Sequence, residues 1–133
     1  MRVMLDTNII ISTGIFSVNK STLHVFSIAD KYDIVLSTQI IEELHTVIER
    51  KFQNKKPDLE RFLKSLNYEI AMTPKNIDDG IYPKIRDNKD YPIFASAIIA
   101  DVDVFITNDK DFSTIDIKRP KIMTLFEFAA LYL

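Results

Sequence analysis

The stretch VMLDTN at residues 3–8 begins the chain with a short apolar run that ends in three polar residues. Similar apolar runs recur along the chain, separated by helical patterns of apolar residues. The other runs that we interpret as strands are 34–36, 68–70, 102–106 and 121–123. Strands that alternate with helices are typical of crossover units. We therefore predict an α/β fold, a three-layer sandwich with a central five-stranded parallel sheet covered by helices on both faces.

Helices are predicted between these strands from the spacing of their apolar residues. Their expected ranges are 21–31, 38–52, 58–66, 92–100 and 124–133. Thr124 and Glu127 have the spacing of a capping box, so the last helix is expected to begin near Leu125. Residues 73–90 form the one long stretch without a clear period, and we expect this stretch to cross the surface.

Composition limits the chemistry that is open to the chain. Its 133 residues, 47% of them hydrophobic, fit a single domain over residues 1–133 with a core that needs no disulfide. Cysteine is absent and only His24 and His45 are present, which excludes thiolate chemistry and zinc fingers. There are 17 Lys and Arg against 19 Asp and Glu, so nucleic-acid binding would depend on local basic patches and bound cations.

Two further absences narrow the function and the location that we expect. Gly14 and Gly80 are the only glycines, and neither lies in a phosphate-binding pattern, which weakens nucleotide-cofactor interpretations. No apolar run approaches the length that spans a membrane, and Asp6 comes too early for a signal-peptide core. We therefore expect a cytoplasmic protein that has no membrane contact.

Acidic residues follow two of the predicted strands. Asp6 comes directly after the first strand, and Asp109 follows the strand that ends at Ile106. Ligands of open parallel sheets gather at the carboxyl ends of the strands, where the strand order reverses. Two carboxylates at adjacent strand ends can share one cation, and Mg²⁺ and Mn²⁺ prefer such oxygen ligands. Asp6 and Asp109 are therefore candidate metal ligands, although single acids in these positions also form turns and loops.

Two more acids can reach the same edge of the sheet from helix starts. On the second predicted helix, a helical wheel places Glu43 beside the apolar stripe and directs Glu42 toward solvent. Asp90 directly precedes the fourth predicted helix, and Asp87 competes with it for a functional role. Each has a simpler alternative, because Glu43 can complement the positive helix end and Asp90 can cap its helix. The convergence of four acids indicates a site more strongly than any one of them.

Four segments together resemble the PIN domain family, and in particular its VapC-like branch. They are MLDTN at 4–8, STQIIEEL at 37–44, DNKD running into IFASA within 87–97, and FITNDKDF at 105–112. The resemblance extends over essentially the whole chain, and the order and spacing of the segments are more specific than any one of them. It implies a PIN-like fold. Asn108 stands where Gly or Arg is frequent in the family, a departure that leaves the acids intact.

The resemblance also implies an activity and its residues. In PIN domains four corresponding acids bind one or two Mg²⁺ or Mn²⁺ ions, and metal-activated water hydrolyses RNA phosphodiesters. The implied metal ligands and catalytic residues are Asp6, Glu43, Asp90 and Asp109. Asn8 and Thr107 match polar positions that support the site through hydrogen bonds to the ligands. VapC-like proteins are toxins that pair with an antitoxin and often form homodimers, so both partners are implied.

Two basic clusters are candidates for contact with RNA. One is RKFQNKK at residues 50–56, and the other comprises Lys84, Arg86 and Lys89, just before Asp90. The alternative for each cluster is an ordinary solvated surface.

Two other functions remain open. A phosphatase of the haloacid-dehalogenase type would use Asp6 as nucleophile, but such enzymes usually carry a second Asp where this chain has Asn8. The stronger alternative is a catalytically inactive PIN-like module with an RNA-binding or regulatory role. The presence of all four acids argues against that alternative, because loss of metal ligands would be its sign.

Overall fold

The computed structural model describes residues 1–16, 25–74, 91–113 and 115–133, and its centre is a parallel sheet. The strands are β1 (Arg2–Leu5), β2 (Asp33–Ser37), β3 (Tyr68–Ala71), β4 (Val104–Ile106) and β5 (Lys121–Met123). They pair in the order β3-β2-β1-β4-β5, and every pair is parallel. All five predicted strands are present, so the predicted α/β sandwich is confirmed.

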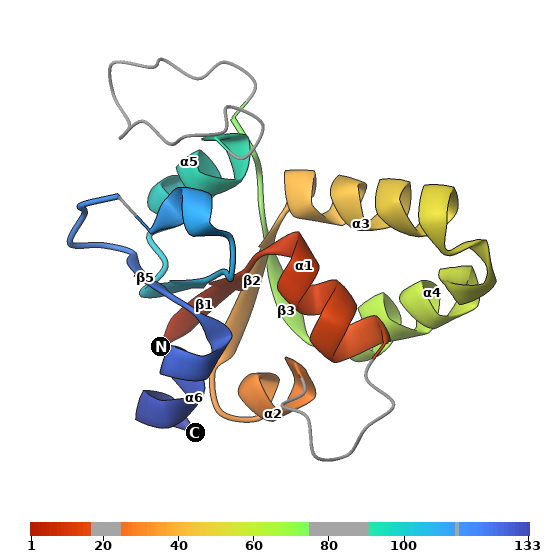
Figure 1. Ribbon diagram of the computed structural model, residues 1–133, viewed down its shortest axis with the longest axis horizontal. Coiled ribbons are helices and arrows are strands. Elements are labelled where there is room, and N and C mark those ends of the chain that lie inside the picture. The colour runs from red at the N-terminus through yellow and green to blue at the C-terminus, as the bar shows by residue number, and fades with distance from the viewer. Residues whose placement is uncertain (17–24, 75–90, 114) are drawn as a thin grey trace.

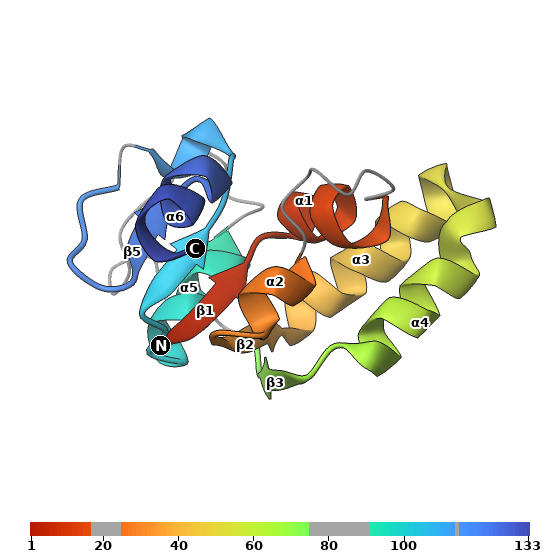
Figure 2. The same ribbon diagram turned by 90° about the horizontal axis from the view of Figure 1, so that it is seen from below.

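Helices lie on both sides of this sheet. The α-helices in the described residues are α1 (Thr7–Ile10), α2 (Val25–Ala29), α3 (Thr38–Lys51), α4 (Lys56–Ser65), α5 (Tyr91–Ile99) and α6 (Leu125–Tyr132). Figures 1 and 2 place α5 and α6 on opposite sides of the sheet. None of the helices in the described ranges has the length and apolar character needed to cross a membrane.

The core explains why the apolar patterns take these forms. β1 and β4 are buried on both faces, with Met4 and Phe105 fully inaccessible, as expected of central parallel strands. The predicted stripe of α3 is buried through Ile40, Leu44 and Ile48, which recur every four residues. This packing fixes the rotation of α3 and therefore decides which of its side chains reach the edge of the sheet.

One helical segment has no counterpart in the sequence prediction, which left the residues after Asp6-Thr7-Asn8 unassigned. The chain turns directly from β1 into α1, which continues as a π-helical turn (Ile11–Ile15). Three consecutive isoleucines have low helix propensity, so local preference does not indicate this helix. Burial of Ile9 and Ile10 stabilises it instead, because both side chains are almost completely inaccessible.

Several boundaries also differ from the prediction. β4 begins at Val104 rather than at residue 102, since the preceding Asp103 directs its carboxylate toward the N–H of Arg2. α4 begins at Lys56, two residues earlier than predicted. In the predicted helix 21–31, the described part is helical only over Val25–Ala29, and residues 21–24 lie outside the described residues. Most of the aperiodic stretch, residues 75–90, also lies outside them.

Candidate active site

The strand order reverses between β1 and β4, because β2 and β3 lie on one side of this pair and β5 lies on the other. Leu5 pairs with Ile106 at the carboxyl ends of the two strands. The next residue in each strand, Asp6 and Thr107, therefore leaves the sheet side by side, and the N–H of Asp6 donates to the Ile106 carbonyl at 3.0 Å. Ligand sites of open parallel sheets form at this topological position.

Asp6 is a buried carboxylate, with 7% of the residue exposed. Its Oδ1 accepts from the Thr7 N–H at 2.8 Å, and its Oδ2 accepts from the Thr107 hydroxyl at 2.7 Å. Burial raises the pKa of Asp6 above its usual value, the two hydrogen bonds lower it, and the charges of Glu43 and Asp109 raise it further. Ionised Asp6 is therefore disfavoured in the metal-free protein, and a nearby cation would offset this.

Glu43 faces the same edge from the second turn of α3. This helix begins directly after β2, where the Ser37 hydroxyl accepts from the Ile40 N–H at 3.1 Å. Glu43 is half-buried, and its Oε2 accepts from the buried Thr7 hydroxyl at 2.7 Å. Glu42, in contrast, is exposed. The rotation of α3 is the one that the helical wheel predicts.

Thr7 is the residue of this site that sequence reasoning missed. Its N–H donates to Asp6 and its hydroxyl donates to Glu43. Thr7 therefore links two acids that are 37 residues apart in the sequence. Its place between Asp6 and Asn8 is a weak signal, because only the unforeseen helix α1 turns its hydroxyl toward α3. Thr7 therefore orients both carboxylates at once.

Asp109 completes the described part of the acidic edge. Its N–H donates to the Thr107 hydroxyl oxygen at 3.0 Å, and its Oδ1 accepts from the Asp111 N–H at 2.9 Å. Thr107 thus links Asp6 and Asp109, since its hydroxyl donates to one and accepts from the backbone of the other. Asp109 also caps a short 3₁₀ helix, Lys110–Phe112.

The remaining predicted residues are placed less directly. Asn8 is exposed, and its expected hydrogen bond to an acid is not present among the described residues. Asp90, its competitor Asp87 and the nearby basic cluster lie outside those residues, as does His24. Asn108 accepts from the Leu125 N–H at 3.1 Å, which joins the end of β4 to the start of α6.

A cavity of about 340 Å³ opens at this edge between the starts of α1 and α3. Its lining residues are Asp6, Thr7, Asn8, Gln39, Glu42, Glu43, Thr46, Val47 and Asp109. The three described acids of the predicted site therefore share one cavity. In the described parts of the chain, they do not approach one another closely enough to form a ready three-ligand metal cluster. Their oxygen donors nevertheless suit Mg²⁺ or Mn²⁺, which usually retain several waters as further ligands.

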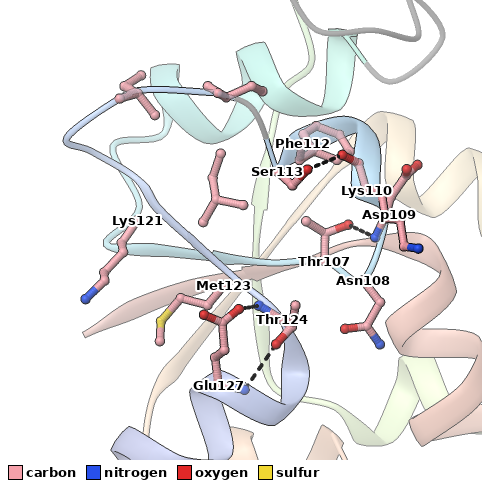
Figure 3. A pocket seen from close by; sticks show the side chains of 13 residues that line it. Thr107, Asn108, Asp109, Lys110, Phe112, Ser113, Lys121, Met123, Thr124 and Glu127 are labelled. Carbon is pink, nitrogen blue, oxygen red and sulfur yellow. Dashed lines mark hydrogen bonds between the residues drawn. The ribbon is translucent and has the colours of Figure 1, made fainter.

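A second cavity, of about 350 Å³, shares Asp109 with the first (Figure 3). It lies at the ends of β4 and β5 and beside the start of α6. The acidic cavity and this second cavity therefore adjoin at one carboxylate.

The chain matches the model of the PIN domain over residues 2–111, and it therefore belongs to the PIN domain family. The match includes Asp6, Glu43 and Asp109. Among solved structures, the fold is similar to that of a chain in the crystal structure of VapBC2 from Rickettsia felis bound to a DNA fragment from its promoter. The two chains are 20% identical with a TM-score of 0.64, and the match covers 92% of this chain and 97% of the other. No curated protein matches the chain.

Proposed function

We propose that this protein is a metal-dependent endoribonuclease that hydrolyses RNA phosphodiester bonds. The observation that carries the proposal is the buried Asp6 carboxylate, flanked by Glu43 and Asp109 at the sheet edge where the strand order reverses. Membership of the PIN domain family supports the same function. The family match concerns the sequence, and the burial of the carboxylate concerns the packing around it.

The proposed metal ligands are Asp6, Glu43 and Asp109, with Asp90 as the fourth acid that the sequence indicates. A bound Mg²⁺ or Mn²⁺ would lower the pKa of a coordinated water and would offset the negative charge of the phosphate. Thr107 and Thr7 hold Asp6 and Glu43 as hydrogen-bond acceptors, which keeps the remaining lone pairs of these carboxylates directed at the cavity.

Of the two basic clusters, the one at residues 50–56 lies within the described residues, and it lies away from the acids. α3 is 14 residues long, so its basic end lies about 20 Å from its start. Lys56 lies 3.7 Å from Glu49, and Lys55 lies over the ring of Phe16, so both have partners in the fold. Arg50 and Lys51 are exposed and remain the better candidates for phosphate.

A toxin role in a toxin-antitoxin pair is the biological setting that we propose. The fold shared with a chain of VapBC2 supports an antitoxin partner. The proposal includes a homodimer and a cytoplasmic location, which the resemblance to VapC-like proteins implies. Co-expression with a candidate antitoxin chain, followed by co-purification, would test the partner. Size-exclusion chromatography with light scattering would test the dimer.

The decisive experiment compares Glu43→Gln with Glu42→Gln, because both side chains line the acidic cavity but only Glu43 is half-buried and held by the Thr7 hydroxyl. Cleavage of a labelled RNA is followed in Mn²⁺, in Mg²⁺ and in EDTA. We expect wild-type cleavage only with metal, a loss of about a hundredfold or more in Glu43→Gln, and near wild-type activity in Glu42→Gln. Wild-type protein that binds RNA without cutting it in either metal would instead support the inactive RNA-binding module.

A further inference from the structure

The acidic cavity offers an anionic substrate few protein groups that could bind it. The charged residues of its lining in the described chain are Asp6, Glu42, Glu43 and Asp109, and no lysine or arginine lies among them. An RNA phosphate that enters this cavity is also negatively charged, so the carboxylates repel it and the proposed cation attracts it. A phosphate oxygen that does not contact the cation therefore needs an uncharged hydrogen-bond donor from the protein.

The uncharged side chains of this lining that can donate a hydrogen bond are those of Thr7, Asn8, Gln39 and Thr46. The Thr7 hydroxyl already donates to Glu43 at 2.7 Å. Asn8 and Thr46 are exposed, so water competes for their polar groups. Gln39 is half-buried, and across the described ranges its side-chain amide has no hydrogen-bond partner. Gln39 is therefore the sheltered donor that remains available to a ligand.

Helix periodicity places Gln39 in the face of α3 that turns toward the cavity. The lining residues on α3 are Gln39, Glu42, Glu43, Thr46 and Val47. On a helical wheel Gln39 falls near the middle of this set, about 40° from Glu43. Residues four apart on a helix are neighbours, and side chains lean toward the start of their helix. The Gln39 amide therefore lies beside Glu43 on the side of the sheet edge where α3 begins.

The backbone of Gln39 is held by hydrogen bonds from two neighbouring elements. Its N–H donates to Thr73 Oγ1 at 3.0 Å, just after β3, and the Thr73 N–H donates to Thr38 Oγ1 at 3.0 Å. From α5, the Ser96 hydroxyl donates to Thr73 Oγ1 at 3.1 Å. Figure 1 shows the start of α3 between α1 and α5. The backbone N–H of Gln39 is thus occupied, and its side chain stands on a fixed turn.

We propose that Gln39 binds the substrate, with its amide N–H donating to a non-bridging oxygen of the phosphate held over the acids. The inference rests on the proposed ribonuclease function for its substrate. A phosphate is favoured over a base because the amide lies beside Glu43, and because the start of α3 carries partial positive charge. An uncharged donor also leaves the acids to the cation, whereas a lysine at this position would pair with Glu43.

The first test is Gln39→Met, which keeps an unbranched side chain of similar length and removes the N–H donor. Its kcat/KM for a labelled RNA in Mn²⁺ should fall about tenfold, because a hydrogen bond to a charged group is lost. Its Kd for Mn²⁺, from isothermal titration, should stay within about twofold of the wild type, since Gln39 is not a proposed ligand. An unchanged kcat/KM, or a loss explained by weaker Mn²⁺ binding, would overturn the contact.

A second variant and its control test the charge at the same position. Gln39→Glu keeps the shape of the side chain but replaces the donor with a charged acceptor, so it should lose more activity than Gln39→Met. Asn67→Asp makes the same amide-to-carboxylate change at an exposed residue just before β3, at the opposite end of the strands. It should keep kcat/KM within about twofold. An equal loss in Asn67→Asp would show a general charge effect and overturn the assignment.

Binding without cleavage separates this inference from the proposed function. Fluorescence anisotropy of labelled oligo(A), oligo(C) and oligo(U) is measured in Ca²⁺, which also prefers oxygen ligands, and a gel checks that the RNA stays intact. A phosphate contact predicts that Gln39→Met weakens binding of all three about equally. A loss confined to one sequence would indicate a base contact and overturn the proposal. An equal loss in a protein that cleaves no RNA in Mn²⁺ or Mg²⁺ would support the contact and overturn only the ribonuclease assignment.

Discussion

Acidic residues gather at both ends of the parallel strands, but in the described structure only the amino ends supply them with arginine partners. There, Arg119 lies 2.7 Å from Asp101 and 2.8 Å from Asp103. The Arg2 N–H donates to Asp103 at 2.7 Å. This N–H holds the pKa of Asp103 below its usual range, with Arg119 adding to the effect.

At the carboxyl ends the setting is reversed. Within the described ranges, no lysine or arginine pairs with Asp6, Glu43 or Asp109, and burial raises the pKa of Asp6. Ionised Asp103 therefore stabilises the fold at the amino edge, whereas burial makes the ionised form of Asp6 unfavourable at the carboxyl edge. A bound cation would stabilise such a set of unpaired acids, and this electrostatic setting agrees with the proposed role of Asp6, Glu43 and Asp109.

The largest expected difference between the two edges is in catalysis. Asp6→Asn should reduce RNA cleavage in Mn²⁺ by about a hundredfold or more, because it removes the charge of a proposed metal ligand from the acidic cavity. Asp103→Asn makes the same chemical change at the amino edge and should keep the rate within about twofold. Initial rates per folded molecule, with circular dichroism as the folding check, make the comparison. Equal losses in the two variants would remove the functional distinction between the edges.

Metal binding should show the next largest difference. Mn²⁺ at a hundred times its Kd should stabilise the wild-type protein by about 2.7 kcal/mol, and Asp6→Ala or Asp109→Ala should largely abolish this. Isothermal titration gives the Kd, and urea unfolding with and without Mn²⁺ gives the stabilisation. If both variants bound Mn²⁺ as the wild type does, these acids would not be its ligands. Asp103→Ala should keep full Mn²⁺ affinity.

The stability of the metal-free protein should change in opposite directions at the two edges. Asp6→Asn removes a buried charge and should raise the free energy of unfolding at neutral pH in EDTA. Asp103→Asn weakens a partly exposed ion pair and should lower it by about 0.5–1 kcal/mol. Urea unfolding at constant ionic strength compares them. A large loss of stability in Asp6→Asn would indicate that Asp6 serves the fold through its hydrogen bonds rather than a cation.

The smallest effect is in the pH dependence of that stability. The pKa of Asp6 is raised above 3.8 by folding, so its contribution is present below that pH and is lost as pH rises through the folded pKa. The advantage of Asp6→Asn over the wild type should therefore grow above pH 3.8 and then level off.

Asp103 should behave in the opposite way in the same series. Its pKa is lowered by folding, so the wild-type advantage over Asp103→Asn should be complete above pH 3.8 and shrink as pH falls further. Unfolding curves collected across this pH range in EDTA would check both variants. Parallel curves for Asp6→Asn and the wild type would contradict the raised pKa.

Much of the fold could be predicted because its signals are local. The five apolar runs form the five strands, and the stripe of α3 packs inward through Ile40 and Leu44. The capping box of Thr124 and Glu127 forms both of its hydrogen bonds. The helix after Asp6 could not be predicted in this way, because three isoleucines disfavour a helix locally and tertiary burial stabilises it.

For the candidate site, the sequence by itself determined the residue types and their places at strand and helix ends. Only the tertiary structure decided their interactions. The Thr107 hydroxyl reaches Asp6 across 101 residues of chain, and the Thr7 hydroxyl reaches Glu43 across 36. The raised pKa of Asp6 depends on burial and on neighbours from α3 and the end of β4. Periodicity and capping act within a few residues, whereas desolvation and charge act through space, so no local pattern contains them.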